Sequence, residues 1–132
     1  MMLGYECANP LPDVSDVLIV EDERVSRKAL ALLLGACGYK TIAAGSGEEA
    51  LRMLGAAKSP HVALLDVDLP GMSGLELAER LEASTPGVFT VLITAAEGDR
   101  IDNFMRDHSV AYLRKPLDFK DLLVLLNNVP AD

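Results

Sequence analysis

Four short apolar runs of this 132-residue chain end in side chains that could bind a metal ion or a phosphoryl group. Asp66 follows the run at residues 62–65, and Pro70 with Gly71 then turns the chain away. Buried parallel strands end in this way at the carboxyl edge of an open α/β sheet, where ligands bind. We therefore take Asp66 as the candidate reactive residue. The other three runs end in Glu21 and Asp22, in Thr94 and in Lys115.

In a parallel sheet these four strand ends lie on the same edge, so the acidic residues would surround Asp66. Carboxylates at such distances repel one another, and a hard cation keeps them ionised at neutral pH. Mg²⁺ fits, because it accepts a few carboxylate or carbonyl oxygens while it keeps several waters. We expect Asp22 and Asp66 to bind it directly and Glu21 to reach it through water. Phosphoryl transfer to Asp66 is then reasonable chemistry, with Lys115 contacting a phosphoryl oxygen.

Strand and helix patterns alternate along the whole chain. Strands are expected at 17–20, 41–44, 62–65, 88–93 and 111–114. Helices are expected at 24–37, 46–55, around 75–81, and at 99–108 and 118–128. Right-handed crossovers place consecutive helices on both faces of a parallel sheet. The sequence therefore predicts a doubly wound α/β fold with five parallel strands.

Apolar spacing also predicts which helix faces are buried. In the first helix the inward stripe is expected at Val25, Ala29, Leu33 and Ala36. The last helix has five consecutive apolar residues at 122–126, which cover more than one face of a helix with 3.6 residues per turn. We therefore expect part of that surface to be exposed or held against a partner or a second copy of the chain.

Composition limits the class of protein. The length suits one domain, with residues 1–15 as a flexible tail and residues 16–132 as the folded part. The net charge of −8 argues against nucleic-acid binding, because 12 basic residues are scattered among 20 acidic ones. No run approaches the roughly 18 apolar residues of a membrane span, and no signal peptide is evident, so we expect a cytoplasmic protein. Cys7 and Cys37 are expected to be free thiols.

Four motifs occur in order along the chain. They are VLIVEDE at 17–23, LLDVDLPGMSG at 64–74, LITA at 92–95 and YLRKP at 112–116. Together they resemble the receiver domain of bacterial two-component response regulators, of the chemotaxis-regulator type, over residues 17–129. The resemblance implies a flavodoxin-like fold with the strand order 2-1-3-4-5.

The resemblance also implies a role for each residue that matches the motifs. Asp66 would be the phosphoacceptor, with Mg²⁺ held by Glu21, Asp22, Asp66 and the backbone carbonyl of Asp68. Thr94 and Tyr112 would form the switch pair, and Lys115 would contact the phosphoryl group before a cis Pro116. Glu21 stands where aspartate is more usual in the family.

The function implied by the resemblance is a switch rather than an enzyme, apart from self-phosphotransfer and autodephosphorylation. A histidine kinase or phosphotransfer protein would supply the phosphoryl group. The face made by the fourth helix, fifth strand and fifth helix would then change its preference for a downstream protein, an output domain or a second copy. Two alternatives stay open: a phosphohydrolase of the haloacid dehalogenase type, suggested by Asp66 and Asp68, and a receiver-like docking module that is never phosphorylated.

Overall fold

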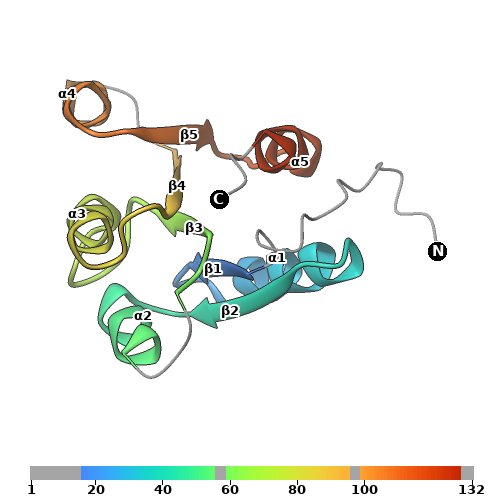
Figure 1. The fold of residues 1–132 in the computed structure, drawn as a ribbon. Coiled ribbons are helices and arrows are strands. Elements are labelled where there is room, and N and C mark those ends of the chain that lie inside the picture. Colours follow the sequence, from blue (N-terminus) through green and yellow to red (C-terminus); the bar gives the residue numbers. More distant parts are fainter. Residues whose placement is uncertain (1–15, 56–58, 96–98, 129–132) are drawn as a thin grey trace.

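The structure is a computed structural model that describes residues 16–55, 59–95 and 99–128. Five parallel strands form one sheet in the order β2-β1-β3-β4-β5 and alternate with five helices (Figure 1). The predicted fold is confirmed, and each strand agrees with its predicted range to within one residue at either end. The predicted tail lies outside the described residues. The elements are β1 (Asp16–Val20), α1 (Arg24–Ala36), β2 (Lys40–Ala44), α2 (Gly47–Leu54), β3 (Val62–Asp66), α3 (Gly74–Ser84), β4 (Phe89–Thr94), α4 (Asp99–Asp107), β5 (Val110–Arg114) and α5 (Phe119–Asn127).

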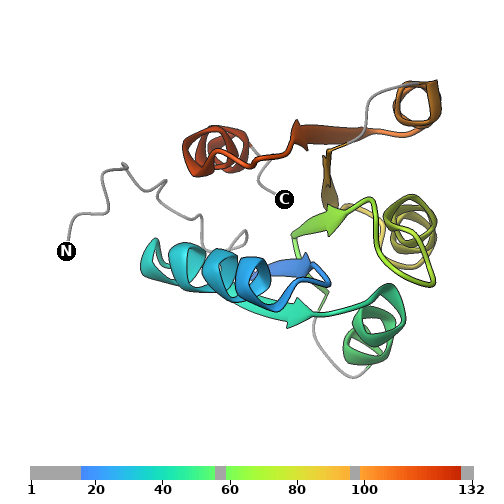
Figure 2. The same cartoon turned by 180° about the vertical axis from the view of Figure 1, so that it is seen from behind.

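Helices cover both faces of the sheet, with α1 and α5 on one side and α2, α3 and α4 on the other (Figures 1 and 2). The central strand β3 is buried along its whole length, because it is covered on both faces. Two apolar clusters result, one on each face. The first contains Leu34 and Leu122 from the helices, and the second contains Leu77 and Leu81.

The inward face of α1 differs from the prediction. The helix buries Leu30 and Leu34, whereas Val25 is 76% exposed. Of the predicted stripe only Leu33 is half-buried, and the other three residues are exposed. The second half of α1 is apolar on nearly every side, so its spacing fits more than one orientation. Packing against the sheet, which the spacing does not record, selects one of them.

The helices α2 and α3 each begin at a serine N-cap. The Ser46 hydroxyl accepts a hydrogen bond from the Glu49 N–H at 3.1 Å, and the Ser73 hydroxyl accepts one from the Glu76 N–H at 3.2 Å. Such bonds satisfy backbone donors that the first helical turn leaves without a partner. The α3 cap fixes where that helix starts, directly after the loop that follows Asp66.

The exposed apolar surface of α5 is smaller than the sequence predicted. In α5 the residues Leu122, Leu123 and Leu126 are buried, so the expected partner surface narrows to Val124, which is 57% exposed.

The predicted free thiol is wrong for Cys37, which is disulfide-bonded. That prediction was based on a reducing cytoplasm, which says nothing about the distance between two thiols. Cys7 lies outside the described residues. Within the described ranges, no helix has the length and apolar content needed to cross a bilayer.

Candidate functional site

The carboxyl edge of the sheet brings the predicted site residues together. Asp66 is the last residue of β3, and Thr94 is the last residue of β4. Glu21 follows β1 directly, and its N–H donates to the Ala44 carbonyl at 3.1 Å. Lys115 follows β5, and its N–H donates to the Thr94 carbonyl at 2.9 Å. Backbone pairing therefore carries each of these residues to the same edge.

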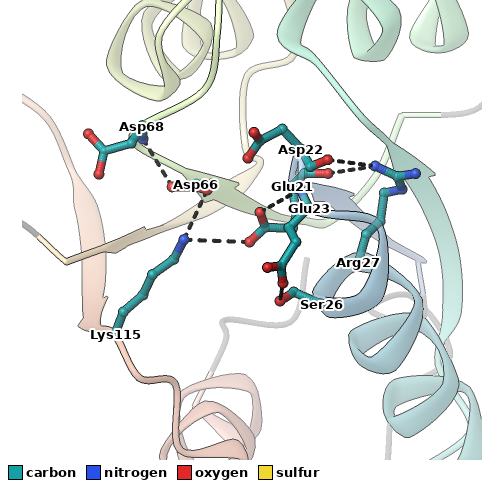
Figure 3. Close-up of polar contacts among 8 residues, drawn as sticks. All are labelled: Glu21, Asp22, Glu23, Ser26, Arg27, Asp66, Asp68 and Lys115. Carbon is teal, nitrogen blue, oxygen red and sulfur yellow. Dashed lines mark hydrogen bonds and ion pairs between the residues drawn. The ribbon is translucent and has the colours of Figure 1, made fainter.

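Three carboxylates form a compact cluster at this edge. Glu21, Asp22 and Asp66 each contribute an oxygen atom, and these atoms lie within 4.8 Å of one another (Figure 3). Glu21 and Asp66 are only 6% and 3% exposed, whereas Asp22 is exposed. Buried carboxylates at this separation favour a cation between them. A set of carboxylate oxygens is the donor chemistry that Mg²⁺ accepts, so the cluster is consistent with a magnesium site.

Lys115 places a positive charge beside two of the three carboxylates, Asp66 and Glu21. Its Nζ lies 3.0 Å from Asp66 Oδ2 and 3.7 Å from Glu21 Oε1 (Figure 3). Burial lowers the pKa of Lys115, but the hydrogen bond and the attraction of Asp66 and Glu21 outweigh burial, so its pKa is raised. The peptide bond between Lys115 and Pro116 is cis, as predicted.

The surroundings of Glu21 disfavour the charged form of its carboxyl group, so its pKa is raised. Burial raises the pKa of Glu21 above its ordinary value of 4.5, and the nearby charge of Asp66 raises it further. The Glu23 N–H, which donates to Glu21 Oε2 at 3.0 Å, and the charge of Lys115 oppose the increase without cancelling it.

A pH dependence follows from the raised pKa of Glu21. The folded chain holds a proton on this group more readily than the unfolded chain, so its contribution to the free energy of unfolding decreases as pH rises through the folded pKa. In metal-free protein we expect Glu21→Gln to be more stable than wild type at neutral pH. That advantage should disappear below pH 4.5, the ordinary value for glutamate.

Urea unfolding of both proteins across this pH range, in the presence of a chelator, measures the difference. Subtracting the two curves removes the titration of the carboxyl groups that do not interact with Glu21. A difference that is constant with pH, or that grows in acid, would contradict the prediction.

The loop after β3 wraps closely around Asp66. The Asp68 N–H donates to Asp66 Oδ1 at 3.0 Å, while the Asp68 side chain is exposed. The Gly74 N–H donates to the Val67 carbonyl at 3.0 Å. A Cβ atom on Gly74 would lie only 2.2 Å from the Asp66 carbonyl oxygen, so only glycine fits at this position. Sequence reasoning did not identify Gly74 as a positioning residue, although its place in the motif at 64–74 was a signal.

Thr94 and Tyr112 occupy adjacent strands in different environments. Thr94 is completely buried at the end of β4. Tyr112 pairs in register with Leu92 and is 40% exposed, with Arg114 as the residue opposite Thr94. The structure therefore places Thr94 at the edge where Asp66 lies and leaves the Tyr112 side chain facing outward. Their predicted role as a switch pair stays a prediction.

The sequence of this chain also matches a model of a known protein family. Residues 17–127 match the model of the response regulator receiver domain. The chain belongs to this family. The receiver domain is 37% identical over 110 residues to the positive alginate biosynthesis regulatory protein of Pseudomonas aeruginosa, covering 81% of this chain and 44% of that protein. It is 38% identical over 85 residues to a cyclic di-GMP phosphodiesterase of Thermotoga maritima, covering 64% of this chain and 22% of that protein. The receiver domain thus spans less than half of the length of these two relatives.

Solved structures resemble this receiver domain over most of its length. A CheY-like response regulator receiver domain protein from Methanospirillum hungatei superposes with a TM-score of 0.79 at 27% identity, covering 86% of this chain and 90% of that one. The response regulator TrrA from Thermotoga maritima, in complex with Mg²⁺-BeF, superposes with a TM-score of 0.77 at 28% identity, covering 88% and 99%. The resemblance to response regulator receivers is confirmed.

Proposed function

We propose that this receiver domain accepts a phosphoryl group on Asp66 from the phosphohistidine of a histidine kinase or a phosphotransfer protein. A carboxylate oxygen of Asp66 forms the new P–O bond as the P–N bond to the histidine breaks, and the imidazole leaves with the electron pair and takes up a proton. The observation that carries the proposal is the buried Asp66 carboxylate, 3.0 Å from Lys115 and clustered with two further carboxylates. This arrangement provides a nucleophile beside a fixed positive charge.

The residues that would hold Mg²⁺ are Glu21, Asp22 and Asp66, together with the backbone carbonyl of Asp68. Glu21 would act through water. When bound, the ion offsets negative charge on the phosphoryl oxygens. The complex of the Thermotoga maritima relative with Mg²⁺-BeF supports this assignment. Lys115 would contact another phosphoryl oxygen, which fits its present contact with Asp66.

Phosphorylation would then act as a switch. It places a phosphoryl group with about two negative charges and three strong hydrogen-bond acceptors at the edge of the sheet, where the Asp66 carboxylate alone carried one negative charge. Thr94 would hydrogen-bond to the phosphoryl group, and Tyr112 would turn inward to fill the space that Thr94 leaves. The face of α4, β5 and α5 would change its preference for a downstream protein, an output domain or a second copy of the chain. Changing the ratio of the switched to the unswitched conformation from about 1:99 to 99:1 requires roughly 5.5 kcal/mol of differential stabilisation.

The compartment and catalytic status follow from the same proposal. We place the exchange in the cytoplasm, where receiver domains typically act. The domain would catalyse its own phosphorylation and dephosphorylation and no other reaction.

The test is to incubate the protein with acetyl phosphate, with Mg²⁺ or with a chelator, and to measure its intact mass. We expect one phosphoryl group per chain, gained only with Mg²⁺ and located by peptide mapping to Asp66. No gain in mass with Mg²⁺ would contradict the proposal and favour the docking module. Continuous turnover of a phosphomonoester, without a stoichiometric labelled form, would favour the phosphohydrolase.

A further inference from the structure

Arg27 reaches back from α1 to the loop that carries the acidic pair. Its Nη1 donates a hydrogen bond of 2.9 Å to the Glu21 carbonyl oxygen and makes a longer, weaker contact of 3.5 Å with the Asp22 carbonyl oxygen (Figure 3). The regular pairing of β1 with β2 ends at Val20 and Ala44. The guanidinium therefore binds the backbone at the point where the chain leaves the sheet and turns its carboxylates toward Asp66.

The charge of Arg27 is in an unfavourable place for helix stability. The first turn of α1 contains no acidic residue, and Arg24, Arg27 and Lys28 all lie near its beginning. Because the amino end of a helix carries partial positive charge, cations there are disfavoured. The hydrogen bond to the Glu21 carbonyl group gives Arg27 a compensating interaction with the loop.

The guanidinium of Arg27 also lies close to the loop that follows β2. A Cβ atom on Gly45 would approach Nη1 to 3.0 Å, so the loop after β2 passes close to the guanidinium. The Gly45 N–H donates to Glu49 Oε1 at 2.6 Å, which ties that loop to α2. Arg27 thus lies between the loops after β1 and β2, with its guanidinium close to Gly45.

We propose that Arg27 is a positioning residue for the cation site, and that it acts by fixing the backbone of Glu21 and Asp22 so that their carboxylates converge with Asp66. The inference rests on the proposed Mg²⁺ site. The direction in which the Mg²⁺ affinity changes when Arg27 is replaced distinguishes positioning from simple electrostatics. A positive charge near the cluster repels Mg²⁺, so its removal alone would tighten Mg²⁺ binding. Loss of positioning would weaken binding instead.

The experiment compares Mg²⁺ dissociation constants of wild type, Arg27→Met, Arg27→Lys and Lys28→Met by isothermal titration calorimetry. Lys28→Met is the matched control, because it removes the same charge from an exposed position next to Arg27. We expect Arg27→Met to bind Mg²⁺ about 10-fold more weakly, as is typical when a partner of a metal ligand is removed. Arg27→Lys, which keeps the charge, should lie between Arg27→Met and wild type, and Lys28→Met should bind as wild type or slightly more tightly.

Labelling by acetyl phosphate gives a second readout. The Mg²⁺ concentration for half-maximal labelling should rise in Arg27→Met, while the rate at saturating Mg²⁺ stays near that of wild type. Circular dichroism checks that each variant is folded. If Arg27→Met does not fold, the comparison of Arg27→Lys with wild type tests the inference instead. A Mg²⁺ affinity of the Arg27 variants equal to or tighter than that of Lys28→Met would overturn the inference alone. Absence of Mg²⁺ binding by wild type would overturn the proposed function and this inference together.

Discussion

Asp66→Asn is expected to gain no phosphoryl group from acetyl phosphate and Mg²⁺ under conditions that label wild type completely. The carboxamide is close in size to the carboxylate, but its oxygen is neutral and is a far weaker nucleophile. It is also a poorer ligand for Mg²⁺, and the acidic cluster keeps only two of its three carboxylates. Intact mass measurement of both proteins at the same donor concentration tests this expectation.

The substitution should leave the fold intact, which makes the result interpretable. The amide oxygen can still accept the hydrogen bond from the Asp68 N–H, which is 3.0 Å from Asp66 Oδ1 in wild type. The variant loses the nearer of the two carboxylates beside Lys115, but it also removes the charge that repels Glu21, and these two effects on stability oppose each other. Asp102→Asn, at an exposed position on α4, is the control and should label as wild type does. Equal labelling of Asp66→Asn and wild type would contradict Asp66 as the acceptor.

Gly74→Ala is expected to lower the free energy of unfolding by about 3 kcal/mol, the upper part of the range for overpacking. The new methyl group would lie 2.2 Å from the Asp66 carbonyl oxygen and 2.7 Å from the Val67 Cα atom. Both are backbone atoms, so no flexible side chain can move aside to make room. The chain must shift where the central strand ends, and the remaining folded protein should also bind Mg²⁺ more weakly.

Urea unfolding measures this effect, and Gly35→Ala provides the matched control. Gly35 lies in α1, and a Cβ atom there would have no neighbour within 4 Å. Because alanine is the better helix former, Gly35→Ala should stabilise the protein by up to about 1 kcal/mol. A Gly74→Ala midpoint equal to or above that of wild type would show that the loop after β3 adapts more easily than its close contacts indicate.

The parts of the site that the sequence predicted depend on strand order and strand ends. Asp66 and Lys115 could be placed together because parallel strands put their carboxyl ends on one edge, whatever the details of packing. The convergence of Glu21 and Asp22 follows from the same rule. These residues carry their chemistry in their side chains, which a sequence displays directly.

The parts that sequence reasoning missed depend on distances between segments. Arg27 binds backbone carbonyl groups, and any residue could supply such a group, so no pairing of side-chain types revealed the contact. Gly74 matters through a close approach to the Asp66 backbone that exists only after α3 has docked. The buried face of α1 likewise depends on how the helix packs against the sheet.

The strand order has a further consequence at the two outer strands. Because β2 and β5 are the edges of the sheet, each has one side without a neighbouring strand among the described residues. Such edges invite pairing with strands of other molecules and so lead to aggregation. Each edge strand has an exposed basic side chain at one end, Lys40 on β2 and Arg114 on β5. Pairing of either edge with a strand of another molecule would bury this charge, so Lys40 and Arg114 help to keep the two edges of the sheet from aggregating.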